Sequence, residues 1–122
     1  MDAEMDGEMD GEYKRRALIL AIRRGYEHSC KAHDLIIKED VELNVALAYL
    51  NSAISSMNSA MTIHTCIDDK LREFEEIYHK FNVFSDEFLD SCETEHSHQS
   101  TSAEFLEFEK EYEYSIVPSY PV

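Results

Sequence analysis

Residues that end helices and form tight turns are almost absent from most of this chain. Between Gly25 and Pro118 there is neither a glycine nor a proline. A stretch of this length without either residue leaves few positions for β-turns and favours long helices. We therefore predict an all-α fold: an antiparallel bundle of three long helices, followed by a short C-terminal fourth helix or an extended segment.

The acidic residues are concentrated at the two ends of the chain. The net charge is −15, of which residues 1–12 and residues 93–122 each contribute −6 and residues 13–92 only −3. Residues 1–12 repeat one acidic tetrapeptide three times and hold too little apolar surface to offset the entropy of ordering. We predict a disordered acidic arm over 1–12, a helical core over 13–92, and an acidic, aromatic C-terminal segment over 93–122.

Residues 14–38 carry the pattern of an amphipathic helix. At 100° per residue the apolar side chains gather in one arc and the charged side chains lie opposite. The arc comprises Leu18, Ile22, Tyr26, Cys30, His33 and Ile37. We expect a short connection near Glu39, with Asp40 as the N-cap of the next helix.

The second predicted helix carries a coiled-coil-like apolar seam. Its apolar residues alternate spacings of four and three, which is typical of helices that pack at a shallow angle. The seam comprises Leu43, Leu47, Leu50, Ile54, Met57, Met61 and His64, and it is widened on one side by Ala46, Tyr49, Ala53 and Ala60. Because the connection before it is short, we expect the first two helices to be antiparallel neighbours.

The third predicted helix is rich in aromatic residues. Thr65, with Asp68 three residues later, resembles an N-cap pair and sets the expected start. An apolar arc then runs as far as Cys92, which predicts a single long helix. Ser85, followed by two acidic residues, leaves open a separate helix after Phe81.

A shorter helix is predicted in the C-terminal segment. Thr101 and Glu104 form a capping-box pair, which places this helix at about 102–113. Its apolar side would consist of Phe105, Phe108 and Tyr112. Residues 108–116 also alternate at period two, so an extended conformation is the alternative.

Two sets of residues match metal-ligand spacings without forming a convincing site. The Glu-x-x-His run at 76–79 has the spacing of di-iron bundles, but both residues fall on the charged side of the third helix. Cys-x-x-His at 30–33 and His-x-Cys at 64–66 supply the ligand types of a zinc site. A hairpin of the first two helices would separate these two pairs by about 24 Å along its axis. We therefore predict no metal and no cofactor.

One side of the second helix carries polar side chains but no charge. Helix faces exposed to water usually carry Lys and Glu, whereas small neutral side chains let another backbone approach and hydrogen-bond across a contact. We predict a docking surface formed by Asn51, Ser52, Ser55, Asn58 and Ser59. The alternative is that the fourth helix covers this face within the same chain.

Glutamates alternate with aromatic residues in the C-terminal segment. The four glutamates are Glu107, Glu109, Glu111 and Glu113. Carboxylates that flank aromatic rings imitate phosphates that flank stacked bases, so this segment could occupy a basic groove on a nucleic-acid-binding protein. Direct nucleic acid binding is not expected, because a net charge of −15 repels phosphates.

Cysteine usage and the acidic N-terminus favour the cytoplasm or another reducing intracellular compartment. Cys30, Cys66 and Cys92 are an odd and widely spaced set, unlike the dense, even sets of secreted domains. A signal peptide begins with basic residues, and this chain begins with acidic ones. The charge-free stretch at 44–67 holds too many Ser and Asn residues for a membrane span, so no membrane association is expected.

These patterns predict a non-catalytic protein–protein interaction module, namely an adaptor, assembly subunit or inhibitor that binds another protein. No catalytic residues are predicted, since neither a nucleophile motif nor a glycine-rich phosphate loop occurs. The first alternative is an acidic inhibitor, or nucleic-acid mimic, that blocks a nucleic-acid-binding protein. The second is a metal-dependent helical-bundle enzyme. Assembly into a homo-oligomer stays open.

Overall fold

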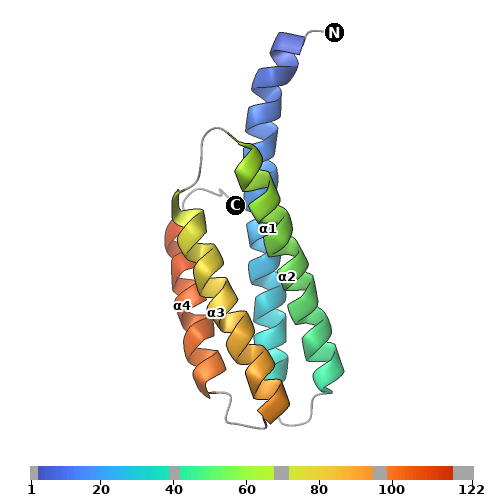
Figure 1. The fold of residues 1–122 in the computed structure, drawn as a ribbon, viewed down its shortest axis with the longest axis vertical. Helices are drawn as coiled ribbons and strands as arrows, with labels where there is room; N and C mark the ends of the chain where they lie inside the picture. Colours follow the sequence, from blue (N-terminus) through green and yellow to red (C-terminus); the bar gives the residue numbers. More distant parts are fainter. Residues whose placement is uncertain (1–2, 39–41, 68–71, 95–98, 117–122) are drawn as a thin grey trace.

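A computed structural model describes residues 3–38, 42–67, 72–94 and 99–116. These residues form four α-helices: α1 (Ala3–Ile36), α2 (Leu43–Cys66), α3 (Arg72–Thr94) and α4 (Gln99–Ser115). Figure 1 shows that the four helices run alternately down and up, which confirms the predicted all-α antiparallel bundle. Among the described residues, no helix combines the length and apolar character needed to cross a membrane.

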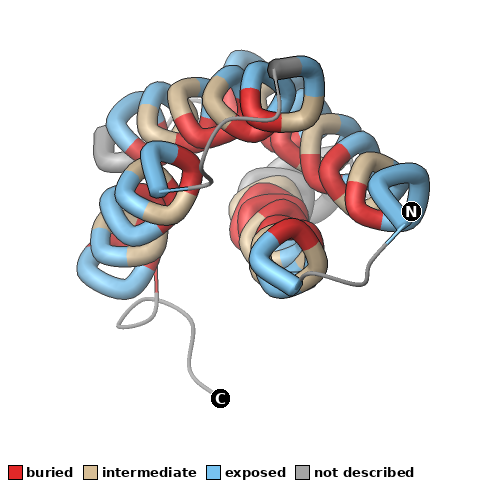
Figure 2. The backbone as a smooth tube through the Cα atoms, turned by 90° about the horizontal axis from the view of Figure 1, so that it is seen from below, coloured by how far each residue is buried: buried red, intermediate tan, exposed pale blue. Residues whose placement is uncertain are grey.

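The bundle consists of two tightly packed helical hairpins. Helix α1 packs closely along α2, and α3 packs closely along α4, whereas α1 meets α4 and α2 meets α3 over smaller areas. Seen from below the bundle, the buried sides of all four helices face a common interior (Figure 2). The core therefore lies between the hairpins, and α4 is part of it.

Small residues set the close approach of α1 and α2. Ala46, Ala53 and Ala60 recur every seven residues along α2 and are fully buried. Gly25 of α1 lies opposite them, where an added Cβ would stand 2.6 Å from the Sδ atom of Met57. The Met57 side chain would therefore have to move to admit a methyl group at position 25, so this glycine permits a close approach of α1 and α2.

This close approach rotates α2 relative to the predicted seam. Of the predicted seam residues, Leu43 is 44% exposed, and Leu47, Ile54 and Met61 are only partly buried. The observed centre consists of Ala46, Leu50, Ala53, Met57, Ala60 and His64. The prediction placed the alanines at one side of the seam, but the helix turns them into the interface and leaves Leu47, Ile54 and Met61 toward its edge.

Phenylalanines dominate the packing of α3 against α4. Phe74, Phe84 and Phe88 are fully buried on α3, as is Phe108 on α4. Helix α3 is continuous from Arg72 to Thr94, so the predicted single helix is confirmed and the alternative break near residue 85 is wrong. Ser85, whose hydroxyl suggested this break, is buried in the bundle.

Three predicted helix ends differ from the structure. The N-cap of α2 is Glu42, without a side-chain hydrogen bond, and Asp40 lies outside the described residues. Thr65 belongs to the last turn of α2, where its Oγ1 donates a hydrogen bond of 2.8 Å to the carbonyl of Thr62. A threonine hydroxyl bonds its own preceding turn as readily as it caps a new helix, so the N-cap pattern misplaced the start of α3.

The predicted cap at Thr101 is also wrong, because α4 begins at Gln99 and continues to Ser115. Thr101 is fully buried, its Oγ1 lies 2.8 Å from Ser91 Oγ, and it donates 3.1 Å to the carbonyl of Glu87. Its hydroxyl joins α3 to α4 instead of capping a helix. The extended alternative for residues 108–116 is excluded over the helical part of this stretch.

The backbone of α1 is helical from Ala3 onward, and the disordered arm expected over residues 1–12 stays a prediction. Most of this acidic segment continues the helix beyond the rest of the bundle, as Figure 1 shows. Adding turns to an existing helix avoids the cost of nucleation, and Ala, Met and Glu all favour helix.

We predict that Gly25→Val destabilises the bundle by about 1–3 kcal/mol through overpacking against Met57. Urea unfolding would measure the change. In the double variant Gly25→Val/Met57→Ala, the shorter side chain relieves the clash, so the total cost should fall below the sum of the single costs by at least about 0.5 kcal/mol. Strictly additive costs would contradict a contact between these residues.

Candidate protein-interaction surface

The outward side of α2 is exposed and free of charge. Helix α2 contains no Asp, Glu, Lys or Arg in its 24 residues. The exposed polar residues of this neutral face are Asn44, Asn51, Ser52, Ser55, Asn58, Ser59 and Thr62. All five residues predicted from the sequence to form a docking surface therefore lie on the surface of the bundle.

Helix α4 does not cover the neutral face. It packs against α3 and α1, whereas α2 packs against α1 and α3, so α2 and α4 occupy opposite corners of the bundle. The alternative that the fourth helix covers this surface is therefore wrong. The reason lies in the up-down-up-down order, in which the fourth helix returns beside the first.

Hydrogen bonds fix the polar side chains at the edge of the neutral face that lies next to α3. Tyr78 Oη of α3 donates a hydrogen bond of 3.1 Å to Asn58 Oδ1. Thr62 Oγ1 donates 3.1 Å to the carbonyl of Asn58 within its own helix. The centre of the face, around Ser55 and Ser59, therefore offers the more accessible hydroxyls for a partner.

The four glutamates of α4 do not form one surface. Glu107 and Glu113 are exposed, whereas Glu109 and Glu111 are partly buried. Glu109 Oε2 accepts a 2.8 Å hydrogen bond from Tyr26 Oη of α1, and Glu111 Oε2 accepts 3.1 Å from Ser115 Oγ. A spacing of two residues turns each glutamate through about 200° on a helix, so alternation in the sequence distributes them around α4.

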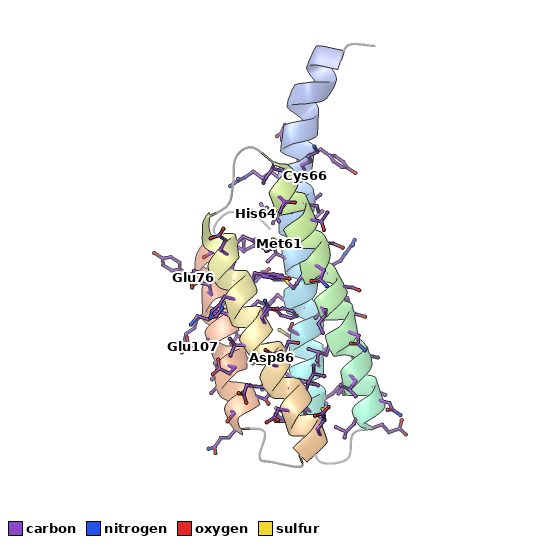
Figure 3. All side chains as sticks on the ribbon, in the orientation of Figure 1. Met61, His64, Cys66, Glu76, Asp86 and Glu107 are labelled. Carbon is purple, nitrogen blue, oxygen red and sulfur yellow. The ribbon has the colours of Figure 1, made fainter. Side chains whose placement is uncertain are left out.

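A shallow hollow lies on the outer side of the α3/α4 hairpin. It has a volume of about 330 Å³, is open to solvent, and is lined by Lys80, Glu107, Lys110, Glu111 and Tyr114. Glu76 and Glu107 both lie on this outer side in Figure 3. Because lysines and glutamates alternate around the hollow, it has no clear preference for either sign of charge.

Stacked aromatic rings join α1 to α4, a contact that the sequence pattern did not indicate. The Tyr26 ring stacks on Tyr112 at 4.1 Å with an interplanar angle of 5°. Two turns further along α1, His33 stacks on Phe105 at 4.4 Å, and its Nε2 lies 2.9 Å from Ser102 Oγ. Tyr26 and His33 thus lie on the part of the apolar arc of α1 that faces α4 and not α2.

Burial shifts the pKa values of the titratable groups in this α1/α4 contact. Burial raises the pKa of the Tyr26 phenol far above its ordinary value, with contributions from neighbouring Cys30 and Glu109. It also raises the pKa of the Cys30 thiol and lowers the pKa of His33. The thiol therefore stays protonated at neutral pH, which makes it a poor nucleophile and metal ligand.

The residues with metal-ligand spacing lie apart from one another. Cys30 and His33 belong to the α1/α4 contact, whereas His64 is buried between α2 and α3, 4.8 Å from the Phe74 ring. Cys66 is exposed at the end of α2, as Figure 3 also shows. Among the described residues, no group of three or more His, Cys, Asp or Glu residues is placed to hold a metal ion.

Comparison of the chain with protein-family models, with curated protein sequences and with solved structures finds no match. Assignment of a function therefore depends on the arrangement of the residues themselves.

We predict that His33 makes stability fall as the pH is lowered. Burial lowers its pKa in the folded state, so its contribution is fully present above the unfolded pKa of about 6.5 and is lost as the pH falls toward the lower folded value. His33→Phe keeps the ring contact with Phe105 and should reduce the slope of unfolding free energy against pH. The exposed control His79→Phe should leave that slope unchanged; equal slopes in both variants would contradict this origin.

Proposed function

We propose that this protein is a non-catalytic protein–protein interaction module that receives a helix of another protein on the neutral face of α2. The proposal is supported by one observation above all: a face of a bundle helix without charge stays exposed and is not covered by α4.

The outer side of α1 provides the internal comparison. Its exposed residues include Arg24, Glu27, Lys31 and Asp34, which is the usual composition of a solvated helix face. The neutral face of α2 instead presents short side chains. Burying them costs little conformational entropy and no desolvation of charge, so a partner backbone can approach closely.

Exposed apolar side chains adjoin the neutral face at the beginning of α2. Leu43 is 44% exposed and Val45 is 43% exposed. Apolar side chains beside small hydroxyl and amide groups supply the two components of a protein interface, an anchor that is removed from water and hydrogen bonds that fix orientation.

We predict that Ser55→Glu weakens partner binding at least about tenfold, because a buried carboxylate without a partner is costly. A photo-crosslinking residue at position 55 would identify the partner, and titration calorimetry would then compare the variants. Asn82→Glu adds the same charge at an exposed position of α3 and should bind within about twofold of wild type. Circular dichroism checks the fold, and equal affinities for both variants would exclude the neutral face.

An acidic inhibitor is the second candidate, and the distribution of charge favours it. Helix α3 holds seven acidic against two basic residues, and α4 holds five against one, whereas α2 holds neither. Exposed Glu107 and Glu113, together with Asp86 and Asp90 of α3, give this hairpin an acidic surface. A basic groove that normally holds nucleic acid would be attracted to it.

We predict for this second function that Glu107→Gln/Glu113→Gln, combined with deletion of residues 1–12, abolishes binding to a basic partner. Raising the salt concentration should weaken binding of the unmodified chain in parallel, because charge attraction is screened. Ser55→Glu is the discriminating control, since it lies on another helix and should retain full affinity. Affinity that survives loss of the acidic residues would exclude the inhibitor function.

A further inference from the structure

The charge of α1 changes sign along one continuous helix. Residues 1–12 carry six acidic residues and no basic one. Residues 13–26 carry the reverse, five basic residues (Lys14, Arg15, Arg16, Arg23 and Arg24) and no acidic one. Because α1 runs from Ala3 to Ile36 without interruption, an acidic helical extension leads directly into a basic stretch.

The acidic extension projects beyond the described parts of the other three helices (Figure 1). A single acidic helix of this length is marginal in water, and the two glycines in it each cost about 1 kcal/mol relative to alanine. Its own bundle supplies no helix that lies alongside it among the described elements. A helix in such a position is stabilised when it packs against another surface.

A complementary surface exists on the same helix. Tyr13 is 72% exposed and Leu20 is 42% exposed, and Arg16 and Arg24 are exposed beside them. At 100° per residue these four positions fall within an arc of about 80°. This outer strip, defined by Tyr13, Arg16, Leu20 and Arg24, lies opposite Gly25, which contacts α2.

We propose that two copies of this chain pair antiparallel through α1, with the acidic extension of each copy lying on the outer strip of the other. A two-fold axis level with residue 14 places residue 16 level with residue 12. It also brings residue 24 within two residues of the level of residue 6, which falls on the same side of the helix as residue 24. The extension is about 15 Å long, which matches the axial distance from the axis to Arg24.

The geometry of the bundle permits this pairing. Helix α2 contacts α1 at Gly25, and α4 contacts α1 at Tyr26 and His33, so both neighbours lie on the side of α1 away from the outer strip. A second copy can approach without meeting either helix. The apolar rings and methyl groups of Tyr13 and Leu20 would be removed from water at the centre of the contact.

A second copy fits better than an unrelated acidic or basic partner because the acidic and basic segments follow each other in one helix. Antiparallel pairing brings each acidic extension to a basic strip in the same step, whereas parallel pairing sets acid against acid. The contact involves α1 and not the neutral face of α2. It therefore goes beyond the proposed function and can be tested apart from it.

Light scattering on the full chain at several concentrations provides the first measurement. Near 50 mM salt we expect a dimer at about 100 µM protein, which dissociates to monomer when salt is raised toward about 1 M because the contact is largely between exposed charges. A chain that stays monomeric at low salt overturns the proposal.

Charge reversal then tests the register. Arg16→Glu/Arg24→Glu should abolish the dimer, and Asp6→Lys/Glu12→Lys should do the same. An equimolar mixture of these two variants should restore a heterodimer, because the charges are exchanged between the copies. Lys31→Glu/Lys38→Glu is the matched control: it changes the net charge by the same amount, at exposed positions beyond the overlap, and should remain dimeric.

Either of two results would overturn the antiparallel α1 pairing: a dimer that survives Arg16→Glu/Arg24→Glu, or a mixture of the two reversed variants that stays monomeric. A dimer lost in Ser55→Glu but kept in the α1 variants would place self-association on α2 and reject the present contact. Circular dichroism of each variant separates loss of the dimer from loss of the fold.

Discussion

The contact of Gly25 with Met57 and the backbone of Ala53 is the constraint on which the surfaces of this bundle depend. Because the Met57 side chain fills the space that a Cβ at Gly25 would take, α1 and α2 pack closely at this point, and α2 turns its alanines into the interface. That rotation carries the opposite side of α2, with its serines and asparagines, to the outside of the bundle. It also leaves Tyr26 and His33 directed toward α4.

The two hairpins are joined to each other in a different way from the two helices of the first hairpin. Within the first hairpin small residues permit close backbones, whereas between hairpins large rings and a few hydrogen bonds span a wider gap. Tyr26 bonded to Glu109 and Tyr78 bonded to Asn58 mark the two junctions. Polar groups at partly buried junctions add specificity, since each one must meet its own partner to offset desolvation.

The same arrangement separates the candidate surfaces by their chemistry. The α3/α4 hairpin is acidic, the outer face of α2 is neutral, and the helical part of α1 beyond its extension is basic. A partner helix that needs close approach would meet α2, whereas association driven by charge would use α1 or the second hairpin. These surfaces face different directions, so occupation of one does not block the others by overlap.

The sequence by itself determined that the chain is helical, because the more than ninety residues between Gly25 and Pro118 contain neither Gly nor Pro. It also identified the buried faces of α3 and α4 by periodicity. It also identified the charge-free side of α2. Only the tertiary structure decided the rotation of α2, the internal role of Thr101, and the hydrogen bond between Tyr26 and Glu109. Periodicity reports which side of a helix is apolar, but the distance between two backbones depends on residues that meet across the interface. The sequence pattern of neither helix alone indicates that Gly25 lies opposite Met57.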